Sequence, residues 1–348
     1  MNFQTLIATK AARICIAAEG GPVVDFGLRR AHGPDAAIGA ARASFIGGAM
    51  GTSNTLAGKL LGIPIRGTIA HSWIESFPSE LEAFRAYAKV YPKGCLLLVD
   101  TYNTLRSGIP NAIKVGRELR DSGEGQLIGI RLDSGDLAYL SKNSRRMLDQ
   151  NGFKETKIIA SSDLDEWLIE SLKKQDSEID IWGVGTRLVT SYSCPALGGV
   201  YKLTAIAENG KMVPKIKRSD NPEKITNPGI KKLVRFYDES GIMRGDVLFL
   251  EDESPNPDKP TRAYHPMFPH IYKAYPPEFE REELFVPVFV NGKRVYETPP
   301  LKEIQENTKK GIGRLGSEFK RFQNPHVYHV SLSEKLFRVK QELLMNAY

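Results

Sequence analysis

A repeating pattern limits the folds that this chain can adopt. Short, mainly apolar runs end in polar or glycine-rich clusters, and helical patterns follow, for example over residues 110–119 and 141–148. Strands that are apolar on both faces are typical of a parallel sheet covered by helices. The polar clusters would then follow the carboxyl ends of the strands, where such folds carry their chemistry. The apolar runs lie at residues 23–24, 63–65, 96–99, 127–130, 158–160 and 179–182.

The distribution of the clusters favours one α/β architecture over another. A doubly wound sheet would concentrate them at one switch point, whereas here a cluster follows every predicted strand. We therefore predict an α/β fold with a (β/α) barrel-like parallel core over residues 1–205.

The pattern changes beyond this core. A smaller antiparallel β region is predicted over residues 206–255, because apolar segments alternate there with turn residues. Prolines recur between residues 255 and 269, so residues 256–348 are predicted to be a loop-rich and helical C-terminal region. The strands are expected at 213–217, 232–237 and 246–250, and a last helix near 333–345.

Composition and charge narrow the class of partner. The 348 residues include 48 Lys and Arg against 41 Asp and Glu, and the formal charge of +7 suits an anionic ligand such as a phosphate ester. No aromatic-basic module of the RNA-binding kind is present, so no nucleic-acid partner is predicted. The three cysteines are widely spaced, and neither a secretory signal nor a long apolar run occurs. These features predict a cytoplasmic protein without a membrane segment.

Ionisable side chains follow several of the predicted strands. His71 lies in the segment GTIAHSW at 67–73, and its imidazole could act as a nucleophile or simply bond a neighbouring loop. Carboxylates at strand ends can accept ribose hydroxyls or hold Mg²⁺ through water, although a single Asp there is also a common helix N-cap. The carboxylates are Asp100, Asp133, Asp136 and Asp163.

A second group of residues suits a phosphate and a flat ring. The segment GVGT at 183–186 leaves backbone N–H groups free to converge on an anion, and Arg187 follows it. Arg29 and Arg131 add guanidinium groups that match planar carboxylates or phosphates. Phe26 could stack on an aromatic ligand, or it could be an ordinary core residue.

Several of these segments, taken in order, resemble the nicotinate phosphoribosyltransferase family. They are DFGLRR at 25–30, GTIAHS at 67–72, RLDSGD at 131–136 and GVGTR at 183–187, followed by KRSDNPEKITNPG at 217–229. The resemblance covers nearly the whole chain. It implies ATP-coupled transfer of a phosphoribosyl group from phosphoribosyl pyrophosphate to nicotinate, which gives nicotinate mononucleotide and pyrophosphate.

The resemblance also implies roles for individual residues. His71 would be the transient phosphoryl acceptor, and the catalytic set would be His71, Asp100 and Asp133. Mg²⁺ would be held by Asp100 and Asp136, mostly through water or substrate phosphates. Arg131 would pack against the pyridine ring, Asp133 would contact ribose, and the glycine segment would bind the 5′-phosphate. The expected substrate contacts are Phe26, Arg29, Ser53, Asn54, Arg131, Asp163, Gly183, Gly185 and Thr186.

The choice of base depends on residues 51–58. The related enzyme that acts on nicotinamide carries an aspartate in this segment, whereas here Ser53 and Asn54 are neutral and no acid is present. A carboxylate ligand would be tolerated there, so nicotinate is favoured over nicotinamide. A helix N-cap cluster would explain the same residues. Quinolinate phosphoribosyltransferase is a third candidate, which would need no ATP and would release CO₂, but the His71 segment argues against it.

The start of the chain differs from the family pattern. The helix at the amino end matches a point after the family's N-terminal domain, so we expect that domain to be absent. The family pattern implies a homodimer with shared sites, in which that domain contributes an aromatic residue to the neighbouring subunit. A truncated chain that binds phosphates without turnover is therefore an alternative.

Overall fold

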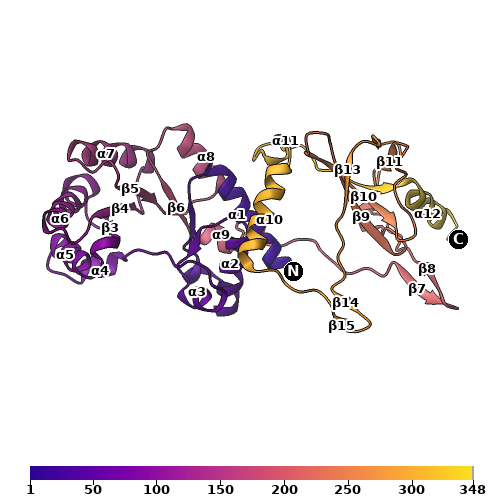
Figure 1. Ribbon diagram of the computed structural model, residues 1–348, viewed down its shortest axis with the longest axis horizontal. Helices are drawn as coiled ribbons and strands as arrows, with labels where there is room; N and C mark the ends of the chain where they lie inside the picture. Colours follow the sequence, from indigo (N-terminus) through magenta and orange to yellow (C-terminus); the bar gives the residue numbers. More distant parts are fainter. Residues whose placement is uncertain (347–348) are drawn as a thin grey trace. The chain divides into compact units, whose positions relative to one another are not determined.

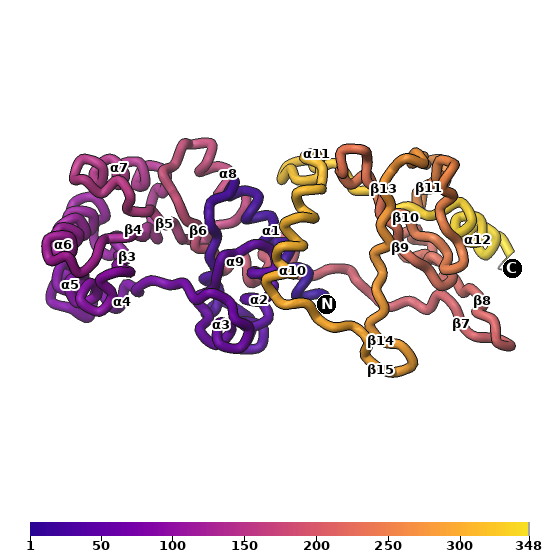
Figure 2. The backbone as a smooth tube through the Cα atoms, in the orientation of Figure 1, coloured from indigo at the N-terminus to yellow at the C-terminus, as the bar shows by residue number. Residues whose placement is uncertain are grey.

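The computed structural model describes residues 1–346. The chain divides into two compact units, the first comprising Met1–Leu197 with Pro300–Lys309 and the second Gly198–Pro299 with Lys310–Tyr348. Figure 1 labels the helices and strands, and Figure 2 follows the backbone through them. Each unit has its own sheet.

The first unit is built on a six-stranded sheet in the order β2-β1-β6-β5-β4-β3, and all of its strand pairs are parallel. Of the six strands in this sheet, those that are consecutive in the chain lie side by side, except for β2 and β3. The last strand, β6, pairs with the first, β1. This is the order of a (β/α) barrel that is open between β2 and β3, and it confirms the predicted barrel-like core. The strands are β1 (Val23–Asp25), β2 (Gly51–Thr52), β3 (Cys95–Leu98), β4 (Leu127–Leu132), β5 (Lys157–Ala160) and β6 (Ile181–Val184).

Helices alternate with these strands, and short polar side chains fix where several of them begin. The N-cap residues Asn54, Ser79, Asn103, Asp136 and Asp165 each accept a hydrogen bond from a backbone N–H of the first turn. The helices are α1 (Asn2–Ala17), α2 (Pro34–Ile46), α3 (Thr55–Leu61), α4 (His71–Glu75), α5 (Glu80–Val90), α6 (Ile109–Ser122), α7 (Leu137–Gln150), α8 (Glu166–Lys174) and α9 (Thr186–Val189), with short helical turns at Leu28–Arg30, Pro92–Gly94 and Thr104–Gly108.

A buried charge cluster joins α1 to α8. Lys10 Nζ lies 2.6 Å from Glu166 Oε2, and their side chains are only 3% and 0% exposed. Arg13 Nε lies 2.8 Å from the other carboxylate oxygen of Glu166, and Lys10 Nζ also contacts Ser193 Oγ at 3.2 Å. Lys10 and Arg13 therefore share one buried carboxylate. Removing that carboxylate would leave the buried ammonium group of Lys10 without a counter-charge.

The predicted strand at 63–65 is wrong in its extent. Only Ile65 forms a bridge there, parallel to Thr52, and the regular strand is β2 at Gly51–Thr52. Pro64 has no N–H to donate, which restricts the ladder to its neighbours. The Pro64 carbonyl accepts from Thr52 N and would lie 2.4 Å from a Cβ on Gly51, so this close approach requires glycine.

The second unit contains a mostly antiparallel sheet in the order β12-β11-β16-β10-β9-β13, in which β10 and β16 are parallel. The region predicted as loop-rich supplies four of these strands in addition to its last helix, α12 (Glu334–Met345). The predicted strand at 213–217 is β8, displaced to Lys211–Pro214. The strands are β9 (Lys231–Tyr237), β10 (Met243–Leu250), β11 (Thr261–Tyr264), β12 (Tyr272–Tyr275), β13 (Glu280–Glu283) and β16 (Val330–Ser333), with hairpins β7 (Ala205–Glu208)/β8 and β14 (Phe289–Val290)/β15 (Lys293–Arg294).

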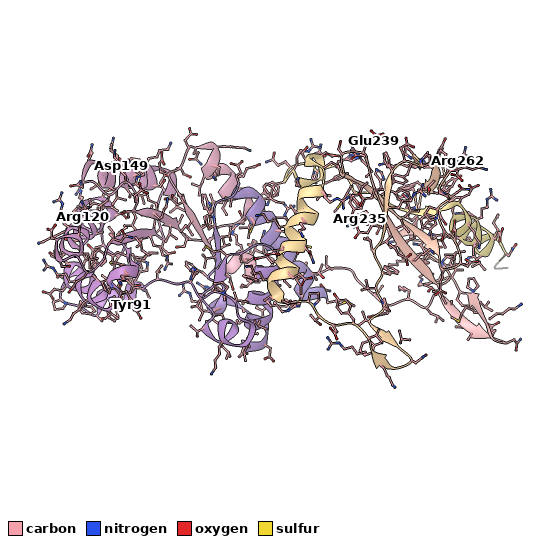
Figure 3. The ribbon with its side chains drawn as sticks, viewed as in Figure 1. Tyr91, Arg120, Asp149, Arg235, Glu239 and Arg262 are labelled. Carbon is pink, nitrogen blue, oxygen red and sulfur yellow. The ribbon has the colours of Figure 1, made fainter. Side chains whose placement is uncertain are left out.

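Apolar packing and one ion pair hold this sheet together. Phe236 and Tyr275 stack with their ring centroids 4.6 Å apart in the core. Arg235, labelled in Figure 3, makes a two-fold contact with the buried carboxylate of Asp246, with both N–O distances 2.8 Å. The remaining helical segments are a short turn at Pro222–Lys224, α10 (Leu301–Arg314), which contains the boundary between the units, and α11 (Ser317–Lys320).

Across residues 1–346, none of the helices has both the length and the apolar character needed to cross a bilayer.

Candidate active site

A cavity of about 780 Å³ lies at the carboxyl edge of the parallel sheet in the first unit. Its walls are the loops that follow β1, β2, β5 and β6, the segment 67–72, and side chains at the end of β4. Strand ends that are far apart in the sequence therefore contribute to one site, as parallel sheets with helical crossovers require.

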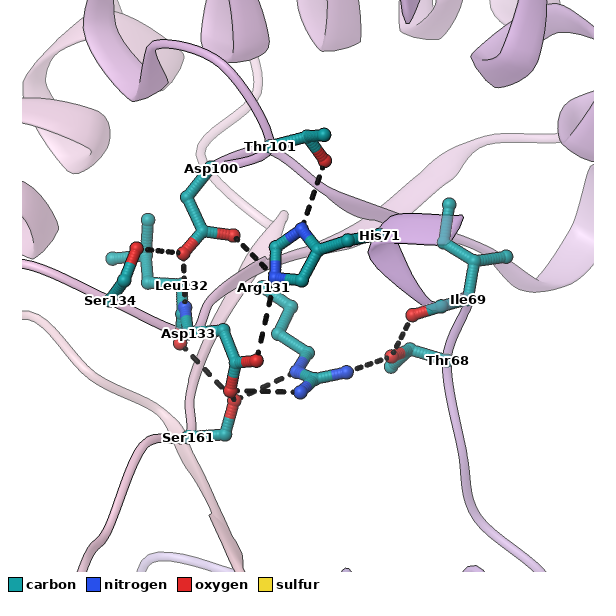
Figure 4. A network of polar contacts seen from close by, with 10 residues as sticks. All are labelled: Thr68, Ile69, His71, Asp100, Thr101, Arg131, Leu132, Asp133, Ser134 and Ser161. Atoms are coloured by element: carbon teal, nitrogen blue, oxygen red, sulfur yellow. Dashed lines mark hydrogen bonds and ion pairs between the residues drawn. The ribbon is translucent and has the colours of Figure 1, made fainter. Parts of the chain in front are cut away.

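His71 begins α4, and its two ring nitrogens face different groups. Nδ1 lies 3.1 Å from Thr101 Oγ1, whereas Nε2 lies 3.6 Å from Asp133 Oδ2 and 4.0 Å from Asp100 Oδ1 (Figure 4). The side chain is 39% exposed, so a ligand in the cavity can reach the ring. Carboxylates on one side favour a proton on Nε2, which leaves the lone pair on Nδ1.

Asp100 orients the loop after β4. Its Oδ2 accepts from the backbone N–H of Asp133 at 2.8 Å and from Ser134 Oγ at 2.6 Å. Its side chain is only 2% exposed, and its Oδ1 has no hydrogen-bond partner among the described residues. That oxygen faces the imidazole of His71.

Asp133 is charged under ordinary conditions. Partial burial alone would raise the pKa of its carboxyl. The Arg131 guanidinium, the hydroxyl of Ser161 and the nearby His71 together outweigh that effect, so the pKa lies below its usual value. A carboxylate that stays ionised can bind hydroxyl groups or stabilise a positive charge close to it.

Arg131 connects four walls of the cavity. Its Nε donates to Ser161 Oγ at 2.8 Å, its Nη1 to Thr68 Oγ1 at 2.8 Å, and its Nη2 lies 2.9 Å from Asp133 Oδ1 (Figure 4). Its Cζ also lies 5.3 Å from the centre of the Phe26 ring, within the range of a cation–π contact. The guanidinium is therefore held in one orientation over an aromatic face.

The ring of Phe26 packs directly against Gly183, and the residue that follows Phe26 is also a tightly packed glycine. A Cβ on Gly183 would lie 2.4 Å from Cε2 of Phe26, and one on Gly27 would lie 2.0 Å from Val189 Cγ1. Asp25 fixes the same loop, since its buried carboxylate accepts from Gly27 N and Thr52 Oγ1, both at 2.8 Å. Burial raises the pKa of Asp25 despite those two bonds.

The opposite end of the cavity presents backbone donors. Ser162 and Asp163 have φ values of 101° and 41°, a region that residues other than glycine rarely adopt. Among the described residues, the backbone N–H groups of Ser162, Asp163 and Gly185 have no hydrogen-bond acceptor. Strained loops with free N–H groups form concavities for anions.

Comparison with known proteins identifies the family. The description "Nicotinate phosphoribosyltransferase (NAPRTase) family" matches residues 22–240, and "Nicotinate phosphoribosyltransferase C-terminal domain" matches residues 230–340. This chain belongs to the nicotinate phosphoribosyltransferase family.

Individual family members align over most of the chain. The nicotinate phosphoribosyltransferase of Bacillus subtilis is 49% identical over 343 residues, which cover 98% of this chain and 69% of the relative. A crystal structure of human nicotinic acid phosphoribosyltransferase superposes with a TM-score of 0.82 at 29% identity, covering 98% of this chain and 74% of that one. A nicotinate-nucleotide pyrophosphorylase from Pyrococcus furiosus gives a TM-score of 0.67 at 25% identity, with coverages of 90% and 71%.

Most of the residues predicted from the family pattern lie together. The cavity is lined by ten of them, while Asp100 contacts His71 without lining the cavity. Asn54 and Asp136 lie elsewhere: Asn54 is buried and caps α3, whereas Asp136 is exposed and caps α7. The ten are Phe26, Arg29, Ser53, His71, Arg131, Asp133, Asp163, Gly183, Gly185 and Thr186.

Arg187 follows the glycine segment that was expected to bind a phosphate, but it does not line the cavity. Its Nη1 lies 2.6 Å from Asp165 Oδ2, and this bond raises the pKa of the guanidinium. Because Asp165 caps α8 and Arg187 follows the glycine segment, the pair ties two site loops to each other and contributes no cavity wall.

Five hydroxyl residues of the site were not among the predicted site residues. Thr68, Ser72, Ser161 and Ser162 line the cavity, and Thr101 contacts His71. Ser161 and Thr101 follow predicted strands, so the rule that site residues follow strand ends could have identified them. Serine and threonine are so common in loops that composition alone does not distinguish them.

Proposed function

We propose that this chain transfers a phosphoribosyl group from phosphoribosyl pyrophosphate to nicotinate, forming nicotinate mononucleotide and pyrophosphate on the route to NAD. The observation that carries the proposal is one cavity that combines a guanidinium over an aromatic ring, a histidine whose Nε2 faces two carboxylates, and a loop with free N–H groups. Family membership and the named relatives support the same substrate pair.

Each part of the substrates has a proposed partner. The pyridine ring would pack between Phe26 and Arg131, and the ribose hydroxyls would bind Asp133. The backbone N–H groups of 162–163 and 185–186 would hold the 5′-phosphate. Arg29 and Arg30, which line the cavity, would meet the pyrophosphate.

The chemistry is substitution at the anomeric carbon. The bond from C1′ to the pyrophosphate oxygen breaks, its electrons leave with pyrophosphate, and the pyridine nitrogen donates the pair that forms the new C–N bond. Positive charge develops on the ribose in between. The ionised Asp133 stabilises that charge, and the cavity holds the two reactants in line.

ATP enters the proposal through His71. Nδ1 would attack the γ-phosphorus of ATP and release ADP, and water would later return the imidazole by releasing phosphate. The carboxylates near Nε2 support this assignment, since they stabilise a proton there while Nδ1 reacts. Phosphorylation would bias the loop toward the productive complex.

Mg²⁺ is proposed as an ion that accompanies the substrate phosphates. Its role would be to neutralise charge on the departing pyrophosphate. Asp100 would hold it through water, because Mg²⁺ takes oxygen ligands and keeps part of its hydration shell. The Oδ1 of Asp100 has no hydrogen-bond partner among the described residues, but the side chain is only 2% exposed and would have to open toward the cavity. Asp136 is a weaker candidate, since its Oδ1 already caps α7. No group of three or more His, Cys, Asp or Glu within residues 1–346 has the geometry of a protein-only metal site.

The decisive assay compares bases with and without ATP. Nicotinate is expected to give mononucleotide faster than nicotinamide by about 10-fold or more, because no acid in the segment 51–58 repels its carboxylate. ATP is expected to stimulate the reaction, and quinolinate should release no CO₂. Product from nicotinamide alone would reject the choice of base, and no product from any base would reject the activity of this chain.

A glycine substitution tests the aromatic slot. Gly183→Ala should raise the KM for nicotinate by about 10-fold, since the added methyl collides with Phe26 and overpacking of this kind costs about 1–3 kcal/mol. Gly94→Ala is the matched control, because a Cβ there meets nothing within 4 Å. Steady-state kinetics and thermal unfolding of both variants make the comparison. An unchanged KM in Gly183→Ala would place the ring binding elsewhere.

We also propose that the chain acts as a homodimer, on the family pattern alone. Light scattering after size-exclusion chromatography measures this directly, and a monomeric mass with full activity would contradict it.

A further inference from the structure

We infer that Ser161 is a positioning residue for the transfer step, because its hydroxyl fixes the carboxylate of Asp133 relative to the guanidinium of Arg131. The inference deepens the proposed function and rests on it, since it takes Arg131 as the partner of the pyridine ring and Asp133 as the partner of the ribose.

The three side chains form a closed ring of polar contacts (Figure 4). Arg131 Nε donates to Ser161 Oγ at 2.8 Å, and Arg131 Nη2 lies 2.9 Å from Asp133 Oδ1. A hydrogen bond from the Ser161 hydroxyl to the same Oδ1 completes the ring. An ion pair alone fixes a distance, whereas the third corner also fixes the angle between the guanidinium and the carboxylate.

The third corner requires a group that both accepts and donates. A guanidinium has no acceptor and an ionised carboxylate has no donor, but a serine hydroxyl has one proton and two lone pairs. The carbonyl of Leu132, at 3.4 Å, is the more distant of the two acceptors that the Ser161 hydroxyl faces. Ser161 is only 3% exposed and commits its proton to Asp133, so it acts through its neighbours rather than by donating to a substrate.

The backbone places Ser161 at this corner. Arg131 and Asp133 are two residues apart at the end of β4, and alternate side chains of an extended chain point to the same side. The backbone N–H of Ser161 donates to the Leu132 carbonyl at 2.9 Å, which extends the parallel pairing of β4 with β5 by one residue. The serine side chain therefore lies beside both charged groups.

The ring determines which oxygen of Asp133 remains for other partners. Oδ1 takes both ring contacts, while Oδ2 lies 3.6 Å from His71 Nε2. Without the hydroxyl the carboxylate can rotate about its Cβ–Cγ bond, because either oxygen can pair with the guanidinium. A small displacement of a group that stabilises charge in the transition state lowers turnover strongly.

In Ser161→Ala we expect kcat for mononucleotide formation to fall by about 10-fold or more, since Asp133 loses its orientation. The KM for nicotinate should change by less than about threefold, because Arg131 keeps its bonds to Thr68 and Asp133 and stays over Phe26. Steady-state kinetics of the full chain with nicotinate, phosphoribosyl pyrophosphate and ATP measure both constants.

Another buried serine of the same unit is the matched control. Ser141 on α7 is fully buried, and its Oγ donates to the Ala138 carbonyl at 3.1 Å and accepts from the Glu178 N–H at 3.2 Å. It does not line the cavity. Ser141→Ala should lower the thermal unfolding temperature about as much as Ser161→Ala does, and it should leave kcat and KM unchanged.

A double variant tests whether Ser161 acts through Asp133. In the Asp133→Asn background, Ser161→Ala should lower kcat by less than about twofold more, because effects within one hydrogen-bonded network are not additive. Mononucleotide accumulated over hours from labelled nicotinate measures these slow variants.

Three results would overturn the inference while leaving the proposed function intact. The first is a Ser161→Ala chain whose kcat stays within about twofold of that of the unaltered chain. The second is a KM for nicotinate that rises about 10-fold at unchanged kcat, which would mean that Ser161 only supports Arg131. The third is a full additional loss of kcat in the Asp133→Asn background. If the unaltered chain forms no mononucleotide, the proposed function fails and the inference fails with it.

Discussion

His71→Ala is expected to abolish the stimulation of mononucleotide formation by ATP and to lower kcat/KM by about 100-fold or more, the scale on which a positioned proton- or group-transfer residue acts. The expectation follows from geometry, since His71 is the imidazole in the cavity and its Nε2 faces two carboxylates. Initial rates over a range of ATP concentrations measure both effects.

A second histidine provides the control for that experiment. His270→Ala removes an exposed imidazole of the second unit and should leave the rates unchanged. Incubation with ATP labelled on its γ-phosphate should label the unaltered chain and not the His71 variant. If ATP still stimulates His71→Ala, another group accepts the phosphoryl or none does.

Glu166→Gln is expected to lower the free energy of unfolding of the first unit by about 3–5 kcal/mol, because it leaves Lys10 buried without a carboxylate. All three tryptophans belong to this unit, so urea denaturation followed by tryptophan fluorescence reports on it alone.

The same helix supplies the matched control. Glu170 pairs with Lys174 at 3.0 Å on the surface of α8, and Glu170→Gln should change the unfolding free energy by less than about 1 kcal/mol. The double variant Lys10→Met/Glu166→Leu should recover much of the lost stability, because it removes both buried charges together. Equal effects of Glu166→Gln and Glu170→Gln would show that burial of the pair has no special weight.

Apolar runs revealed the parallel core because its strands are buried on both faces. β3 and β4 illustrate this, with Leu97, Leu98, Ile130 and Leu132 fully buried. The strands that escaped prediction lack such runs. β13, with the sequence EREE, is held in its sheet by backbone pairing with β9, and no side-chain pattern signals that pairing.

The site was predictable to the extent that strand ends meet at one edge of a sheet. That rule brings together His71, Asp100, Arg131 and Asp133. It cannot separate a ligand-binding aspartate from a capping one, because Asp133 and Asp136 follow the same strand three residues apart. Which of them caps α7 depends on where that helix begins, and only the folded backbone determines this.

The opening between β2 and β3 has a mechanical consequence for the histidine. In a closed barrel, displacing a residue at the rim would strain the ladder on both sides. Here the chain passes from its single bridge at Ile65 to α4 through residues 67–70, and in the part of the chain described these form no ladder bond. Moving His71 then breaks side-chain hydrogen bonds, each worth about 1 kcal/mol, but no bond of the sheet. The sheet beside it can therefore stay rigid while the histidine moves.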